Sequence, residues 1–227
     1  NDHFEFYWVP HTRWALTKRN RRTDEPARPR SRAQEWYQDM VLQNYAFGAL
    51  CRVGRRWPSL ISRLAKIIPS TGRVEYVDRS DRVFTSPRKV RFWEMEYAVP
   101  REALPEALNR VRRLVDEIGV PISFPVEARV VRGDDAWLST AYGRDTGYIA
   151  VHVYRGTPYD AYFSGVERIM DDYDGRPHWG KLHYQRAESL AGRYPRWDDF
   201  QRVRARLDPE QRFGNPYLDR VIGSANG

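Results

Sequence analysis

The stretch that decides the expected fold is VRFWEMEYAVPREALPEALNRVRRLVDEIG, residues 90–119. Its first ten residues are rich in aromatic and branched side chains and stop at Pro100, which predicts a strand over 90–99. Apolar residues then recur every three or four positions, which predicts an amphipathic helix over 101–119 that ends at Gly119. A strand followed at once by a helix with one apolar face indicates a sheet with helices packed against it. The side chains expected to face inward from this helix are Leu104, Leu108, Val111, Leu114, Val115 and Ile118.

The segments that follow extend the same pattern. Two further strands are predicted at 122–132 and 148–155, and a helix begins after them with Thr157 as its N-cap. The order strand–helix–strand–strand–helix has connections too irregular for a doubly wound parallel sheet. We therefore predict an α+β fold, with an antiparallel sheet, helices packed on one face and a ferredoxin-like centre. The whole chain, 1–227, is predicted to form a single domain.

The first ninety residues predict less regular structure. Residues 3–9 alternate between two faces, as a strand does. Apolar residues follow the helical period from Ser31, and a second helix is predicted over 57–68. Short strands are predicted at 74–78 and 81–85.

Composition is that of a globular protein, with 227 residues, 41% hydrophobic and 30% charged. No apolar run approaches the roughly 18–20 residues that a membrane span needs. The chain opens without Met on the aromatic segment FEFYWVP, so we expect it to be part of a longer protein. Its one cysteine, Cys51, excludes an intramolecular disulfide and a cysteine-based zinc site. Cys51 lies among apolar residues and is predicted to be a buried structural thiol, which fits cytoplasmic residence.

The positive charge is concentrated at one end of the chain. Residues 1–73 contain 14 Lys and Arg against 6 Asp and Glu, and this excess equals the whole net charge of +8. Much of it lies in KRNRRTDEPARPRSR, residues 18–32, which we predict to be a basic loop. Such a run can contact nucleic acid or an acidic membrane, or it can be a solvated loop. The solvated loop is favoured and no nucleic-acid partner is predicted, because no nucleic-acid-binding signature accompanies the run. A peripheral contact with a membrane stays open.

One predicted strand carries a candidate binding pair. In FPVEARVVRG, residues 124–133, Glu127 and Arg129 project from the same face, about 7 Å apart along the strand. A carboxylate that accepts hydrogen bonds and a guanidinium that donates them can together bind a polyol. The alternative is a surface ion pair of little energetic consequence. His152, on the next predicted strand, either joins this face or is a satisfied core histidine.

The segment PHWGKLHY, residues 177–184, places Lys181 between a glycine and aromatic flanks. Either this is a surface turn, or the turn holds a cation against a bound ligand. Metal binding is not predicted, because His178 and His183 are five residues apart and no carboxylate or thiol completes a familiar ligand set. The glycine patterns that bind phosphates and the GxSxG elbow of hydrolases do not occur in the sequence.

The HWGK of residues 178–181 resembles a segment near the carboxyl end of sugar-1,4-lactone oxidoreductases, which belong to the vanillyl-alcohol oxidase family of flavoproteins. Other segments resemble that family in the same order along the chain, so the similarity covers nearly all 227 residues. The resemblance is to the group acting on L-gulono- and D-arabinono-1,4-lactone, with alditol oxidases as near neighbours. Members carry an amino-terminal FAD-binding domain, so this chain would be the substrate-binding half. The other matching segments are FEFYWVPHT (4–12), RFWEMEYAVP (91–100), FPVEARVVRGDDAWLSTAYGRD (124–145) and RFGNPYLDRVIG (212–223).

The resemblance also implies residue roles. The cofactor would be FAD, and the substrate a sugar lactone or polyol. Lys181 and Arg129 would stabilise negative charge on the reduced flavin or hold the reacting hydroxyl, and Glu127 would bind substrate hydroxyls or accept a proton. Further roles implied by position are substrate contacts for His152, His178 and Trp179, and flavin contacts for Gly180, Lys181, Asn215 and Tyr217.

Two hypotheses of different classes therefore stand. In the first, the chain is the substrate domain of an FAD-dependent aldonolactone oxidoreductase, with alditol oxidase as the variant within that class. In the second, it is a basic α+β module that binds nucleic acid or anionic lipid. The first hypothesis is favoured by the ordered matches along the chain.

Overall fold

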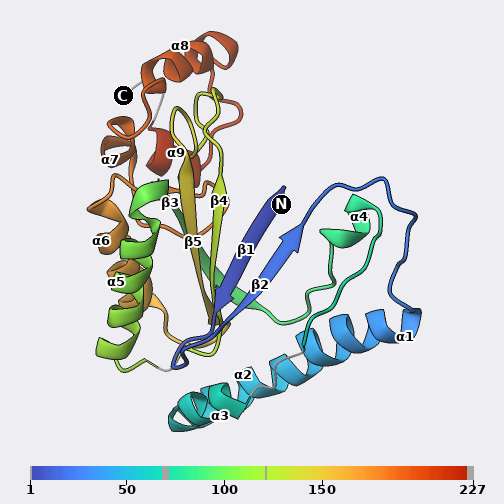
Figure 1. The fold of residues 1–227 in the computed structure, drawn as a ribbon. Coiled ribbons are helices and arrows are strands. Elements are labelled where there is room, and N and C mark those ends of the chain that lie inside the picture. The colour runs from blue at the N-terminus through green and yellow to red at the C-terminus, as the bar shows by residue number, and fades with distance from the viewer. Residues whose placement is uncertain (1, 68–71, 121, 224–227) are drawn as a thin grey trace. The chain divides into compact units, whose positions relative to one another are not determined.

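The computed structural model describes residues 2–67, 72–120 and 122–223. The chain packs as two compact units. Unit 1 comprises Asn1–Trp93, Val115–Val126 and His152–Tyr159, and unit 2 comprises Glu94–Leu114, Glu127–Val151 and Asp160–Gly227. The strands are ordered β2-β1-β4-β5-β3-β6 in a six-stranded sheet (Figure 1). Strand β1 pairs antiparallel with β2, β3 with β6, and β4 with β5, so the predicted α+β class is confirmed. That the chain acts as one domain stays a prediction.

Unit 1 begins with a β-hairpin. β1 (His3–Trp8) pairs with β2 (Ala15–Asn20), and the turn between them is held by the Thr12 hydroxyl, which donates to the Val9 carbonyl at 2.7 Å. The predicted basic loop 18–32 is therefore wrong at its start, because its first three residues belong to β2. The alternation of Leu16 and Lys18 with Thr17 and Arg19 suits a strand, and Lys18 is paired with Glu5 across the hairpin at 3.2 Å.

A long helical segment follows in unit 1. It begins at Ser31 as predicted, and Ser31 is its N-cap, since the Ser31 hydroxyl accepts from the Gln34 N–H. The segment runs through α1 (Arg32–Glu35), a π-type stretch (Trp36–Ala46) and α2 (Phe47–Arg56). The predicted helix over 57–68 is a 3₁₀ turn (Pro58–Leu60) followed by α3 (Ile61–Ile67), and its last predicted residue lies outside the described residues.

Two strand predictions in unit 1 are wrong. Residues 74–78 form only an isolated bridge between Arg28 and Val77, and the segment predicted at 81–85 instead contains the short helix α4 (Ser80–Val83). Side chains alternate there, but no neighbouring strand pairs with the segment over several residues. A strand needs such a partner to satisfy the hydrogen bonds of its backbone N–H and C=O groups. Cys51 is buried as predicted, and burial raises the pKa of its thiol to about 11.

Unit 2 is built on the predicted strand–helix–strand–strand–helix pattern. β3 (Phe92–Pro100) leads through a 3₁₀ turn (Arg101–Ala103) into α5 (Leu104–Glu117), and β4 (Val126–Val131) pairs with β5 (Thr146–Tyr154). After α6 (Asp160–Asp171), the short β6 (Arg176–Pro177) returns beside β3. The resulting strand order, β4-β5-β3-β6, is that of a ferredoxin-like βαββαβ unit.

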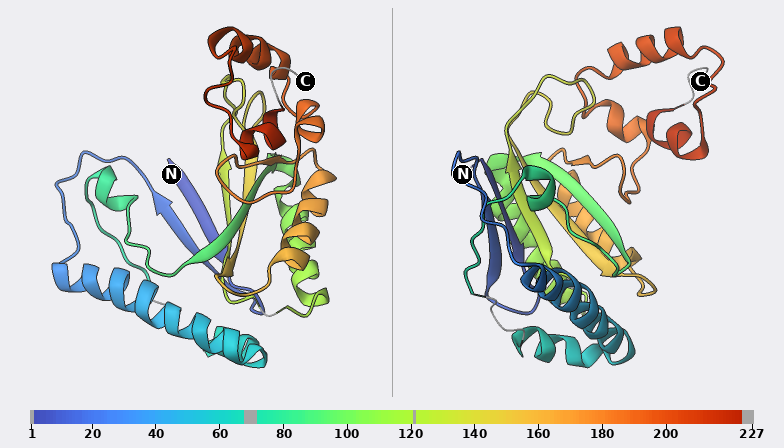
Figure 2. Two further views of the ribbon diagram at one scale, coloured as in Figure 1. Left: turned by 180° about the vertical axis from the view of Figure 1, so that it is seen from behind. Right: turned by 90° about the vertical axis from the view of Figure 1, so that its right-hand side faces the viewer.

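Helices α5 and α6 lie on the same face of β3, β4 and β5 (Figures 1 and 2). Glycines allow the close approach: a Cβ on Gly147 of β5 would lie 2.7 Å from Leu104, and one on Gly165 of α6 would lie 2.8 Å from Leu114. On the same face, the buried Tyr97 hydroxyl donates to Glu167 of α6. α6 starts at Asp160 rather than at Thr157, because residues 155–157 form a turn in which Gly156 has a φ of +90°.

Three helices close unit 2: α7 (Ala187–Ala191), α8 (Trp197–Leu207) and α9 (Pro216–Ile222). Their apolar side chains and Tyr194, which lies between α7 and α8, form a core cluster whose buried members are Leu190, Tyr194, Trp197, Val221 and Ile222. Within the described ranges, none of the helices is long and apolar enough to span a bilayer. Because α5 and α6 take one face of the central strands, the charged side chains Glu94, Glu96, Glu127 and Arg129 of β3 and β4 project from the other.

Candidate functional site

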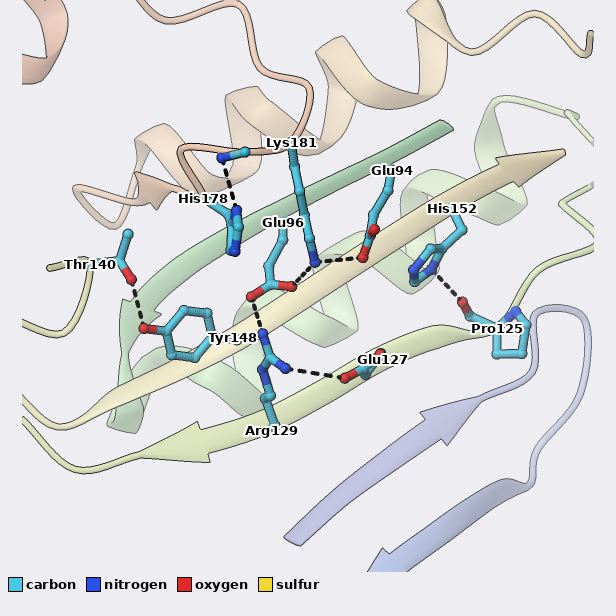
Figure 3. Close-up of polar contacts among 11 residues, drawn as sticks. Glu94, Glu96, Pro125, Glu127, Arg129, Thr140, Tyr148, His152, His178 and Lys181 are labelled. Atoms are coloured by element: carbon cyan, nitrogen blue, oxygen red, sulfur yellow. Dashed lines mark hydrogen bonds and ion pairs between the residues drawn. The ribbon is translucent and has the colours of Figure 1, made fainter. Parts of the chain in front are cut away.

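The charged side chains project from β3 and β4 at alternate positions, on the face opposite α5 and α6 (Figure 3). β4 supplies Glu127 and Arg129 side by side, as predicted, with Arg129 Nη1 3.7 Å from Glu127 Oε1. β3 supplies Glu94 and Glu96, which the sequence reasoning did not select. The sequence does show the pattern: in E-M-E, residues 94–96, two glutamates flank Met95, which is buried, so they share the opposite face of the strand.

Lys181 completes this group from outside the strands. Its Nζ lies 2.5 Å from Glu94 Oε1 and 2.5 Å from Glu96 Oε2. The other oxygen of Glu96, Oε1, lies 2.5 Å from Arg129 Nη2. The side chain of Glu96 is only 1% exposed, so one buried carboxylate bridges the two cations and fixes the distance between their head groups. We call Glu94, Glu96, Glu127, Arg129 and Lys181 the bridged cluster.

The charge of the bridged cluster bears on its chemistry. Three carboxylates against two cations give a net charge of −1 when all are ionised. Burial alone would lower the pKa of the Arg129 guanidinium, but the charge and hydrogen bond of Glu96 outweigh burial and raise it. Arg129 is therefore a permanent cation. The two cations are already neutralised by carboxylates, so they act as donors held in place rather than as surplus positive charge.

The turn that presents Lys181 is an insertion in the ladder between β3 and β6. The pairing of Tyr97 with Pro177 continues when the His178 N–H donates to the Glu96 carbonyl at 2.9 Å. The next bond to β3 comes from the N–H of Leu182, which donates to the Glu94 carbonyl at 2.9 Å. From His178 to Leu182 the chain advances four residues, while the partner positions on β3 advance only two, from Glu96 to Glu94. The two extra residues are accommodated in a bulge, which re-aims the side chains that follow it.

Aromatic residues anchor this bulge. The Trp179 indole N–H donates to the Leu138 carbonyl at 2.9 Å, and its ring lies 5.2 Å from that of Tyr194 in the core cluster of α7–α9. The Tyr217 hydroxyl donates to the Trp179 carbonyl, and His183 Nε2 lies 3.1 Å from the same hydroxyl. Because that hydroxyl gives its one proton to Trp179, His183 donates to Tyr217.

The other predicted ligand residues are placed as follows. Asn215 is the N-cap of α9, and its Oδ1 accepts from the N–H groups of Tyr217 and Leu218. Gly180 is exposed at the outer edge of the bulge, and a Cβ there would meet only the His178 ring, at 3.5 Å. Flavin contacts for Gly180, Asn215 and Tyr217 stay predictions.

His152 lies in unit 1, where it is 6% exposed and packs between aromatic rings. Its ring centroid lies 5.2 Å from that of Phe92 and 5.9 Å from that of Phe124, and its Nδ1 lies 3.3 Å from the Pro125 carbonyl. These contacts are those of a core histidine. Its substrate role stays a prediction.

Tyr148 is a further residue at the site that the sequence reasoning missed. It pairs with Arg129 across β4 and β5, and the Arg129 guanidinium lies 5.2 Å from the centre of its ring. Its hydroxyl shares a 2.6 Å hydrogen bond with Thr140. Arg176, which is buried, fixes that loop by donating to the Thr140 and Tyr142 carbonyls at 3.3 and 2.8 Å. The described part of the chain holds no group of three or more His, Cys, Asp or Glu arranged to bind a metal ion.

The site therefore presents fixed donors and carboxylate acceptors on the sheet face opposite α5 and α6, an arrangement suited to a small ligand rich in oxygen atoms. A comparison with protein families finds a match to D-arabinono-1,4-lactone oxidase over residues 1–221. The chain belongs to this family, so the family membership expected from its sequence is confirmed.

Individual relatives agree with the family match. The chain is 51% identical over 227 residues to the L-gulono-1,4-lactone dehydrogenase of Mycobacterium tuberculosis, and 30% identical over 230 residues to the L-gulonolactone oxidase of Bos taurus. Each match covers 98% of this chain and 52% of the relative. The alditol oxidase of a Streptomyces species is 37% identical over 132 residues, which covers 57% of this chain and 31% of that protein. The chain thus spans about half the length of the first two relatives.

Proposed function

We propose that the chain is the substrate-binding half of a flavin-dependent oxidoreductase that dehydrogenates an aldono-1,4-lactone of the L-gulono or D-arabinono type. The observation that carries the proposal is the bridged cluster, in which Glu96 holds Lys181 and Arg129 as paired donors beside the carboxylate of Glu127. A lactone offers matching groups, since its ring carbonyl accepts hydrogen bonds and its hydroxyls both donate and accept them. The names of the relatives that cover nearly the whole chain support this substrate class.

The residues present fit FAD, which we propose as the cofactor. The exposed backbone of Gly180 leaves room for a planar ring to approach, because only the His178 ring lies within 4 Å of where its Cβ would be. Lys181 follows that glycine in the chain and His178 lies two residues before it, and both side chains can donate to ring carbonyl oxygens. The remainder of the cofactor site would come from a region equivalent to the part of the relatives that lies outside the match, since each match covers 52% of the relative.

The reaction converts a CH–OH group into a carbonyl, which removes a hydride from carbon and a proton from oxygen. A bound flavin supplies the acceptor for the hydride. Lys181 and Arg129 would hold the substrate oxygens, and Glu96 would keep both head groups in position while the ligand binds. Glu127 would accept the hydroxyl proton, since it lies on the same face beside Arg129 and its side chain is 14% exposed.

An alditol would present hydroxyls but no carbonyl, and the shorter match to the alditol oxidase favours the lactone. The test is steady-state turnover of the full-length, flavin-loaded protein with an artificial electron acceptor. L-gulono-1,4-lactone, D-arabinono-1,4-lactone and xylitol are compared at equal concentrations. We expect one of the two lactones to have the highest kcat/KM. A preference for xylitol would assign the protein to the alditol branch.

A further inference from the structure

The positive charge of the chain belongs to unit 1. Unit 1 contains 20 Lys and Arg against 11 Asp and Glu, a net charge of +9, whereas unit 2 contains 18 against 19, a net charge of −1. Ion pairs occupy part of the basic run 18–32, since Arg28 lies 2.7 Å from Glu25 and Arg30 lies 2.9 Å from Asp39. Much of the unpaired charge of unit 1 therefore lies outside that run.

Three other segments of unit 1 carry cations with no acidic residue among them. No Asp or Glu occurs in residues 40–67, 83–93 or 152–159, which together hold nine Lys and Arg. All nine are exposed, and none forms an ion pair with a residue that the structure describes. We call this set the basic face. Its members are Arg52, Arg55, Arg56, Arg63, Lys66, Arg88, Lys89, Arg91 and Arg155.

The three segments that carry the basic face are in contact. The first comprises α2, the 3₁₀ turn and α3, which follow one another in the chain. The second segment meets α2 at Gly48, where a Cβ would lie 3.4 Å from the Val90 side chain. The third meets the second where the Arg155 N–H donates to the Arg91 carbonyl at 3.0 Å. The nine cations thus belong to one connected region of unit 1, where they repel one another and attract polyanions.

Aromatic side chains lie among these cations. Trp57, between α2 and the 3₁₀ turn, is 52% exposed, and the Arg56 guanidinium lies 5.4 Å from its ring centre. Tyr45 is also 52% exposed, and Lys89 Nζ lies 5.5 Å from its ring centre. Tryptophan and tyrosine are enriched where a bilayer meets water, since each ring is apolar and carries one polar group. Cations attract the anionic headgroups at the same level.

We propose that the basic face is a docking surface for an anionic phospholipid bilayer, with Trp57 at the level of the headgroups. The phosphates of a nucleic acid would attract the same cations. The exposed indole of Trp57 favours a bilayer, because the headgroup region accepts an apolar ring beside charge, and the sequence has no nucleic-acid-binding signature. The contact is peripheral and goes beyond the proposed reaction, because no residue of the basic face belongs to the bridged cluster.

The first test is co-sedimentation of the full-length protein with phospholipid vesicles. Vesicles of phosphatidylcholine that contain phosphatidylglycerol are compared with vesicles of phosphatidylcholine alone. We expect binding to the anionic vesicles only, and weaker binding as salt is added, because exposed charges are screened. Reversing Arg52, Arg55 and Arg63 together to Glu should weaken binding at least about a hundredfold, at roughly fivefold for each cation removed. No binding by the wild type, or equal binding to the neutral vesicles, would overturn the proposal.

A matched control separates this surface from the net charge of the protein. Reversing Arg19, Arg21 and Arg22 together to Glu changes the net charge by the same amount at exposed positions of the run 18–32. This control should bind the anionic vesicles within about threefold of the wild type. An equal loss in both triple variants would show that the vesicles respond only to net charge, and would overturn the proposal. So would displacement from the vesicles by single-stranded RNA at equal phosphate concentration, which would assign the surface to nucleic acid.

A second test does not depend on charge reversal. Lipids brominated in their acyl chains quench the fluorescence of tryptophans that reach the bilayer. We expect anionic vesicles with these lipids to quench the wild type, and Trp57→Phe to remove most of the quenching while the protein still sediments. Trp36→Phe is the control, since Trp36 is 58% exposed but lies outside the basic face. Quenching unchanged in Trp57→Phe would overturn the placement of Trp57. A failure of lactone oxidation would leave both tests valid, because neither uses turnover.

Discussion

Replacing Glu96 with alanine should destabilise this chain more than any other single change in the bridged cluster. Its carboxylate is 1% exposed and binds both Lys181 and Arg129 at 2.5 Å. Removing one partner of a buried ion pair costs about 3–5 kcal/mol, because the remaining charge is left uncompensated. Here Lys181 keeps Glu94, and Arg129 keeps Glu127 and is 37% exposed, so we expect the lower end, about 3 kcal/mol.

The measurement is urea unfolding of the chain by itself at neutral pH, followed by far-ultraviolet circular dichroism. For a chain of this size, a slope of about 3 kcal/mol per molar urea converts the expected loss into a midpoint lower by about 1 M. Glu96→Gln keeps the shape and one acceptor oxygen, and should cost about 1–2 kcal/mol.

A matched control is Asp81→Ala, which removes an exposed ion pair with Arg79 at 3.0 Å. Its effect should stay within about 0.5 kcal/mol, because exposed pairs contribute little. If Glu96→Ala were no more destabilising than this control, Glu96 would not bridge the two cations in solution, and the positioning argument for the site would fail.

Four further predictions concern catalysis, pH and surface charge. In the full-length, flavin-loaded protein, Lys181→Ala should lower kcat at least about tenfold, which corresponds to an activation barrier about 1.4 kcal/mol higher. A kcat equal to that of the wild type would show that Lys181 has no catalytic role. Glu127→Gln should slow flavin reduction by lactone while the flavin stays bound, whereas release of the flavin would indicate a structural role. Burial, with a smaller contribution from Arg220, lowers the pKa of His183 to about 4, from 6.5 when exposed. The folded state therefore binds fewer protons, so the free energy of unfolding should fall as pH drops from 6.5 through 4, by about 3 kcal/mol in total, and His183→Gln should remove this slope in acid titrations. Reversing the charge at the exposed arginines of residues 18–32 should leave lactone turnover unchanged. Loss of turnover together with loss of binding to anionic vesicles would favour the lipid-binding hypothesis.

The centre of the fold could be predicted because its residues repeat at the periods of strands and helices. The stretch 90–119 shows both periods in succession, and the structure places β3 and α5 there. The same reasoning failed at 74–78, where alternation occurs without a neighbouring strand to pair with. Periodicity describes one segment, whereas a strand also depends on its partner.

The candidate site could be predicted only in part, for a related reason. Strand alternation places Glu127 and Arg129 on one face, and the structure agrees. It does not reveal which distant segment lies opposite, and Lys181 is 85 residues from Glu96 in the chain. The contact depends on the two-residue bulge after β6, which has no periodic signature. Glu96 was missed because a glutamate within a strand looks solvated until its neighbours are known.

The most direct test of the central claim is anaerobic reduction of the flavin in the full-length protein. The visible absorbance of the oxidised flavin is followed after addition of L-gulono-1,4-lactone or D-arabinono-1,4-lactone, with xylitol as the comparison. Our account predicts that a lactone bleaches the flavin of the wild type faster than xylitol does, and that Lys181→Ala and Glu127→Gln slow this step. A flavin that is bound but is bleached by neither lactone would contradict the assignment of this chain as a lactone-binding half.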